Sequence, residues 1–125
     1  MTGGLILCHQ QWGKGSSSSV RKGRKFIEQQ INFGYDTADS DLYAHYYYGQ
    51  AMINFGGTTW DNYNKLFRDD VLNAQNIDGS FRAPGGGNKI NGTATVYVTN
   101  QHYRTCLATL MLEVYYRFLP GTSSQ

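Results

Sequence analysis

Apolar residues recur along this chain at the three- and four-residue spacing of an α-helix, in segments that end at or near glycines. The clearest stripe consists of Trp60, Tyr63, Phe67, Val71 and Ala74. One helix would place these five side chains on a single face, which is typical of a helix packed on a core. The predicted helices cover residues 2–13, 17–31, 40–55, 59–75 and 100–118. The pattern therefore predicts an all-α fold.

Residues able to cap or stop a helix stand at the expected ends. We expect a serine within 16–19 to cap the second helix and Asp39 or Ser40 to cap the third, because short oxygen-bearing side chains accept hydrogen bonds from free N–H groups. Thr58 or Thr59 would start the fourth helix. Residues 76–98 lack helical periodicity, so we expect a long extended loop there, with one local hairpin and an alternating pattern at 93–98.

Composition narrows the class of protein. The chain has 125 residues, which fits one domain over 1–125, and its 11 Lys and Arg against 9 Asp and Glu give no basic surface for nucleic acid. No apolar run is long enough to span a membrane. Cys8 and Cys106 stand alone in apolar segments, so we expect buried thiols and neither a disulfide framework nor a zinc ribbon. The two cysteines do not indicate whether the protein works in a reducing or an oxidising compartment.

The chain contains a weak internal repeat. Gln30 and Gly34 are matched by Gln75 and Gly79, and the two glutamines are about 45 residues apart. Each glutamine follows a helical segment that carries two apolar residues at the same distance before it. A period of this length filled by two helices is typical of stacked α/α hairpins.

The segment from Gln75 to Phe81 resembles the QW motif of the squalene-cyclase and prenyltransferase repeat superfamily, with Phe81 in place of the usual tryptophan. Residues 22–34 resemble a degenerate copy that lacks the final aromatic residue. The whole chain is similar to uncharacterised bacterial members of this terpenoid cyclase-like group. The resemblance implies an (α/α)6 toroid around a central cavity, in which the motif glutamine and aromatic residue tie successive hairpins together.

Six hairpins of this period need roughly 270 residues, so the chain would hold about 2.5 repeats. We therefore expect a C-terminal fragment of a longer toroid, or a chain that covers its open repeat edges by contact with further copies.

In this superfamily the N-terminal ends of the inner helices face the cavity. The resemblance thus implies catalytic candidates at Asp36, Asp39 and His45, because burial would raise a carboxyl pKa toward that of a general acid. It implies binding candidates at Asp41, Tyr46, His102 and Tyr103. Helix capping is the competing role for Asp39 and Asp41.

The motifs that define the superfamily's enzymes are missing. The chain has no DxDD acid motif, and it lacks the Asp-x-Cys pair and the histidine of the prenyltransferase zinc set, since Arg104 stands before Thr105 and Cys106. We therefore expect no metal or cofactor. The favoured function is a non-catalytic toroid module whose cavity and 76–98 loop bind a hydrophobic ligand, a carbohydrate or a protein. A terpenoid cyclase or prenyltransferase-like enzyme and a self-associating structural module are the alternatives.

Overall fold

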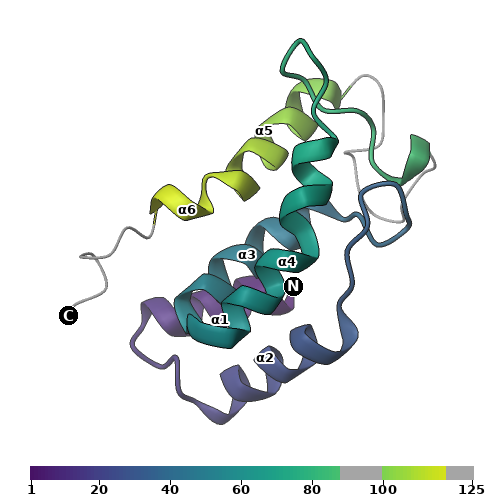
Figure 1. Cartoon of the computed structure of the whole chain (residues 1–125). Coiled ribbons are helices and arrows are strands. Elements are labelled where there is room, and N and C mark those ends of the chain that lie inside the picture. The colour runs from purple at the N-terminus through teal and green to yellow at the C-terminus, as the bar shows by residue number, and fades with distance from the viewer. Residues whose placement is uncertain (88–99, 118–125) are drawn as a thin grey trace.

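The computed structural model describes residues 1–87 and 100–117, and in these residues the secondary structure is helical (Figure 1). The α-helices are α1 (Thr2–Gln11), α2 (Ser18–Gln30), α3 (Leu42–Phe55), α4 (Gly57–Asn73), α5 (Gln101–Leu112) and α6 (Val114–Arg117), and a 3-10 turn, η1, covers Gly85–Gly87. The described part of the chain contains no β-strand, and one isolated bridge joins Gln75 to Phe81. The prediction of an all-α fold is confirmed.

Two of the predicted helix starts are wrong. Asp41 caps α3, since its Oδ1 accepts a hydrogen bond from the Ala44 N–H at 3.1 Å. Ser40 is not the cap, and its buried hydroxyl donates instead to the carbonyl of Thr37. Helix α4 begins after Gly56, which has a φ of +66° and no side chain to cap with, so neither Thr58 nor Thr59 is its cap. Helix α2 is capped by Ser17, within the expected serines.

The helices form two neighbouring hairpins. A Cβ on Gly3 would meet Tyr48, and the Gln10 amide donates to the carbonyl of Ala51, so α1 and α3 pack side by side and run in the same direction. Helix α2 turns back along α1, where Gly23 lies against Ile6. Helix α4 likewise packs on α3, and α5 packs on α3 at the other side from α1 (Figure 1). The result is a layer of α1, α3 and α5, with α2 and α4 packed on it.

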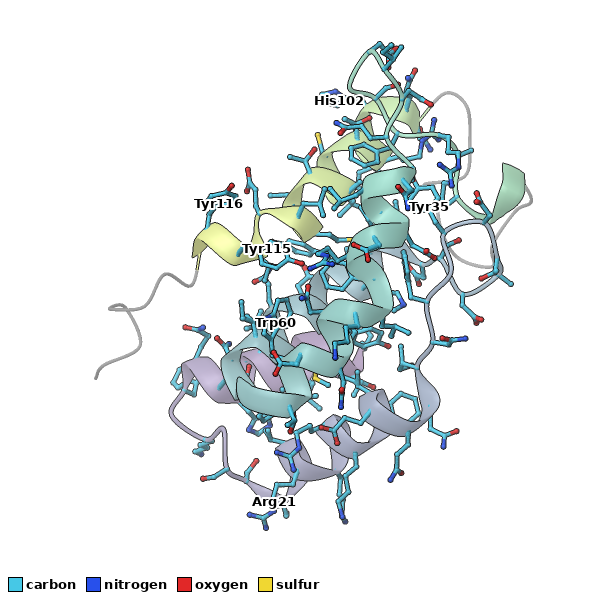
Figure 2. All side chains as sticks on the ribbon, viewed as in Figure 1. Arg21, Tyr35, Trp60, His102, Tyr115 and Tyr116 are labelled. Atoms are coloured by element: carbon cyan, nitrogen blue, oxygen red, sulfur yellow. The ribbon has the colours of Figure 1, made fainter. Side chains whose placement is uncertain are left out.

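The hydrophobic core lies between these layers. On α4 the predicted stripe is buried at Tyr63, Phe67, Val71 and Ala74, while Trp60 is half-buried against Tyr115 with ring centroids 5.7 Å apart (Figure 2). No helix in the described residues is long and apolar enough to cross a membrane.

The expectation that both cysteines are buried is wrong, since Cys8 and Cys106 are exposed free thiols. Each lies in an apolar stretch but on the side of its helix that faces away from the core, which is built from Ile6 on α1 and from Leu107 and Met111 on α5.

The described part of the 76–98 loop begins with a tight hairpin. Asn76 donates its N–H to the carbonyl of Ser80, and Gly79 takes a φ of +86°, a backbone conformation that glycine adopts at little cost. The Gln75 amide donates to the carbonyl of Gly79 at 3.0 Å. Phe81 is fully buried, and its carbonyl accepts from Nε of Arg104 on α5 at 2.8 Å. The alternating segment 93–98 lies outside the described residues.

The two copies of the repeat motif differ in structure. Gly34 does not share the positive φ of Gly79, and a Cβ there would meet the Thr37 side chain at 2.9 Å. Gln30 is exposed. The amide nitrogen of Gln75 donates within its own turn, so the expected tie between hairpins is not seen at this atom. The link to the next helix is made by Phe81.

The segment before α3 is tied to the end of α4 through Tyr35. Its backbone N–H donates to Asp70, its hydroxyl donates to the carbonyl of Arg82, and its carbonyl accepts from the N–H of Gly85 at 2.7 Å. Figure 2 shows the buried Tyr35 side chain between this segment and α4. Burial raises the pKa of its phenol to about 12, so the hydroxyl keeps its proton and its donor role.

Candidate functional site

One side of α3 faces neither the core nor α4. Tyr43, Tyr47, Gln50 and Asn54 follow one another at helical spacing and therefore share that side, while His45 and Met52 point to the opposite side, toward α4. We call the tyrosine–amide face the set formed by these four residues of α3, Gln10 of α1 and Tyr103 of α5. It lies on the layer of α1, α3 and α5.

The tyrosines of this face lie edge to face. The ring centroids of Tyr43 and Tyr47 are 5.2 Å apart, and the ring of Tyr46, which lies beside the face, is 5.0 Å from that of Tyr47. Tyr43 and Tyr103 remain 45% and 40% exposed. A hydrogen bond with Tyr43 raises the pKa of the Tyr47 phenol, and burial raises that of Tyr103, so both are neutral hydroxyls near pH 7. The rings thus offer apolar surface together with hydrogen-bonding groups.

Primary amides continue the face toward the C-terminal end of α3. Asn54 donates to Oε1 of Gln10 at 3.0 Å, and the Gln10 amide nitrogen donates to the carbonyl of Ala51. Gln50 is only 9% exposed, and its Nε2 has no hydrogen-bond partner within the described part of the chain. A buried amide N–H without a partner is costly, so a ligand acceptor that reached it after a small movement of its neighbours would be bound favourably.

The structure brings together some of the binding residues expected from the sequence. Asp41, Tyr46 and Tyr103 lie around the N-terminal end of the face, where the Asp41 charge and Tyr43 also help to raise the pKa of Tyr103. Asp41 acts as the α3 cap. His102 is exposed on α5, and its Nε2 lies 3.7 Å from the Cys106 sulfur (Figure 2). A step of one residue turns His102 about 100° away from Tyr103, so it lies beside the face.

The expected catalytic role of Asp36 is not supported by its surroundings. Asp36 is exposed, and its carboxylate binds Arg82 through two hydrogen bonds of 2.8 and 3.0 Å. This pairing lowers the carboxyl pKa, so the expectation of a burial-raised acid is wrong at this position. Asp39 is also exposed and lies in the turn before α3.

His45 lies in a different environment from these two carboxylates. Its ring is buried, with Nδ1 2.8 Å from the Tyr63 hydroxyl and the Phe33 ring centroid at 4.7 Å. Burial lowers the pKa of His45 to about 4, which leaves the imidazole neutral near pH 7. Asp36, Asp39 and His45 therefore do not form one acid–base site, because the histidine points into the core and Asp36 is drawn to Arg82.

The described residues contain no group of three or more His, Cys, Asp or Glu side chains placed to hold a metal ion. Comparisons of the chain with protein-family models, curated proteins and solved structures returned no match. The resemblance to the squalene-cyclase and prenyltransferase repeats therefore remains a prediction from the motif residues.

Sequence reasoning missed the amides of the face. Gln50 and Asn54 follow Tyr43 and Tyr47 at the spacing of one helix side, which is the signal that could have found them.

Proposed function

We propose that this chain is a non-catalytic binding module of the α/α-toroid type, with about 2.5 hairpin repeats, whose tyrosine–amide face binds a neutral oligosaccharide. The observation that carries the proposal is the unpaired, buried amide nitrogen of Gln50 on the same side of α3 as the exposed Tyr43 ring and the half-buried Tyr47 ring.

The helix arrangement supports the toroid part of the proposal. Helices α1 and α3 are parallel and adjacent, each is followed by a helix that packs back on it, and α5 continues the layer. In a toroid of this kind the free side of such a layer lines the cavity, and the tyrosine–amide face occupies that side here.

The chemistry of the face favours a sugar. Its defining residues are uncharged, so they would not select a phosphate or another strong anion. Tyrosine rings can stack on the C–H groups of a pyranose, and amides can both donate to and accept from ring hydroxyls. Sites of this type combine aromatic walls with a few placed polar groups.

The alternative of a cyclase or prenyltransferase-like enzyme has less support among the described residues. A protonating enzyme needs a carboxylic acid with a raised pKa in a dry cavity. Asp36 has a lowered pKa and pairs with Arg82 in an exposed position.

The proposal is tested by screening the protein on an array of neutral oligosaccharides and measuring the affinity of the best binder by calorimetry. We expect Tyr47→Ala and Gln50→Leu each to weaken binding by about tenfold or more, because each removes a contact of the face. Tyr116→Ala is the matched control, since Tyr116 is an exposed tyrosine on α6 outside the face. Absence of any sugar binder, or equal affinities for all the variants, would overturn the proposal.

One observation favours self-association as a second candidate function. Leu5 and Cys8 on α1 and Trp12 at its C-terminal cap are exposed at helical spacing. An apolar stripe of this kind is typical of a contact surface. Light scattering of the protein at several concentrations tests it: self-association predicts one defined oligomer, which the double change Leu5→Gln and Trp12→Gln would return to the monomer.

A further inference from the structure

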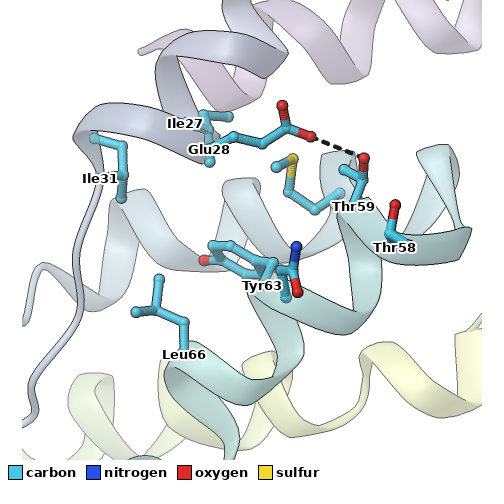
Figure 3. Close-up of a pocket in the computed structure, with 9 residues that line it drawn as sticks. Ile27, Glu28, Ile31, Thr58, Thr59, Tyr63 and Leu66 are labelled. Atoms are coloured by element: carbon cyan, nitrogen blue, oxygen red, sulfur yellow. Dashed lines mark hydrogen bonds between the residues drawn. The ribbon is translucent and has the colours of Figure 1, made fainter.

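A pocket lies on the opposite side of α3 from the tyrosine–amide face. It is an open hollow between α2, α3 and α4 with a volume of about 390 Å³. This is within the range of small-molecule sites. Its apolar lining comes from Ile27, Ile31, Met52, Tyr63 and Leu66 (Figure 3).

The floor of the pocket is fixed by its packing. Tyr63 presents its ring to the pocket, while its hydroxyl is held by His45 on the far side. Met52 is buried beside it, and a thioether side chain adapts readily to the shape of an apolar group. A flat or branched hydrocarbon group therefore suits this floor.

The rim of the pocket is polar and carries one acidic group. Thr59 donates its hydroxyl to Oε1 of Glu28 at 2.8 Å, across the opening between α4 and α2 (Figure 3). Arg24 approaches the same oxygen at 3.7 Å, but Arg24 does not line the pocket. Neither contact uses Oε2 of Glu28. Glu28 is therefore the acidic group among the lining residues, which include no basic side chain.

We propose that this pocket binds a small organic amine, with an aromatic or branched aliphatic group on Met52 and Tyr63 and its ammonium group at the carboxylate of Glu28 on the rim. The ammonium donates hydrogen bonds to a carboxylate that Thr59 already orients, and such charge-assisted bonds are stronger than neutral ones. The pocket is separate from the tyrosine–amide face, so this proposal stands or falls without the one above.

The first test compares phenethylamine with phenylacetate on the unaltered protein by calorimetry. The two molecules share the phenyl group and differ in the sign of their charge. We expect phenethylamine to bind and phenylacetate to bind at least about tenfold more weakly, because Glu28 repels the carboxylate. Equal affinities, or no binding of the amine, would overturn the proposal. The comparison does not depend on whether a variant folds.

Two variants then locate the site. Glu28→Gln should weaken phenethylamine binding by about tenfold, and Ile31→Trp should abolish it by filling the pocket. Asp61→Asn is the matched control, because it removes an exposed carboxylate of α4 that does not line the pocket. Tyr47→Ala should leave amine binding unchanged. If Glu28→Gln and Asp61→Asn lowered the affinity equally, the attraction would come from net charge and the assigned contact would be wrong.

Fluorescence gives an independent measure of the same event. The chain has 2 tryptophans, and Trp60 lies beside Tyr63 with ring centroids 6.4 Å apart. In a Trp12→Phe background the emission of Trp60 should therefore change as phenethylamine fills the pocket. Emission that stays constant while calorimetry records binding would place the amine elsewhere.

Discussion

The Tyr63 hydroxyl lies 2.8 Å from Nδ1 of His45, and both side chains are buried between α3 and α4. The imidazole also forms a hydrogen bond with the backbone of Asn32, in the segment before α3. A neutral histidine with these partners fits the core, whereas a protonated one would place a charge there. One polar pair thus joins two helices and an adjoining segment.

The surroundings of His45 predict a loss of stability in mild acid. Burial lowers its pKa in the folded protein to about 4, whereas an unfolded histidine titrates near pH 6.5. Between these values the unfolded chain binds more protons, so the free energy of unfolding falls as the pH drops from about 6.5 to about 4. We expect a loss of about 3 kcal/mol from this group, measured by urea denaturation at a series of pH values.

The control for this prediction is His45→Phe, which keeps a ring in the core and removes the titration. The variant should be less stable at pH 7, since Tyr63 loses its partner, but its stability should change less between pH 6.5 and 4. An unaltered pH slope in the variant would assign the acid sensitivity to other groups.

Removing the partner hydroxyl tests the same pair from the other side. Tyr63→Phe leaves Nδ1 of His45 buried without its partner, which should cost about 1–3 kcal/mol of unfolding free energy. Tyr116→Phe is the matched control, because Tyr116 is exposed. Denaturant unfolding of the two variants decides the question, and equal stabilities would mean that the buried bond contributes nothing net.

Periodicity predicted where the helices lie, because helix formation follows local spacing, but the single helix expected over 100–118 is divided at Glu113 into α5 and α6. The stripe from Tyr63 to Ala74 is buried as the spacing requires. The pairing of His45 with Tyr63 could not be predicted, since it depends on how α4 packs on α3. The same holds for Asp36, whose partner Arg82 follows 46 residues later.

The sequence predicted only those residues of the candidate site that lie near the N-terminal ends of helices. Asp41, Tyr46 and Tyr103 do gather at the N-terminal ends of α3 and α5. The exposure of Cys8 was not foreseen, because the apolar residues around it do not share one face. Whether the Gln50 amide nitrogen finds a hydrogen-bond partner depends on which side chains pack around it, and a sequence pattern does not predict that packing.

Phe81 is expected to be the main anchor of the hairpin that follows α4. The side chain is 1% exposed and lies in the core, so Phe81→Ala should lower the unfolding free energy by about 3–5 kcal/mol. Ile77, in the same hairpin, is 109% exposed, and Ile77→Ala should change stability by less than about 0.5 kcal/mol. Thermal and urea unfolding of both variants compares them directly. Similar losses would mean that the hairpin does not dock through Phe81.

The ion pair of Arg82 and Asp36 should contribute less to the free energy of unfolding than its short hydrogen-bond distances suggest. Both side chains are partly exposed, so solvent and salt screen their attraction, and Asp36→Asn should cost less than about 1 kcal/mol. Arg82→Met should cost more, because Arg82 also donates to the carbonyl of Asn73 at 2.7 Å and lies over the Tyr35 ring. Stabilities measured at low and high salt separate the contributions. The cost of Asp36→Asn should shrink as salt rises, while most of the Arg82→Met cost should persist. If both costs vanished in salt, Arg82 would act through its charge alone and its contacts with Asn73 and Tyr35 would not hold the loop.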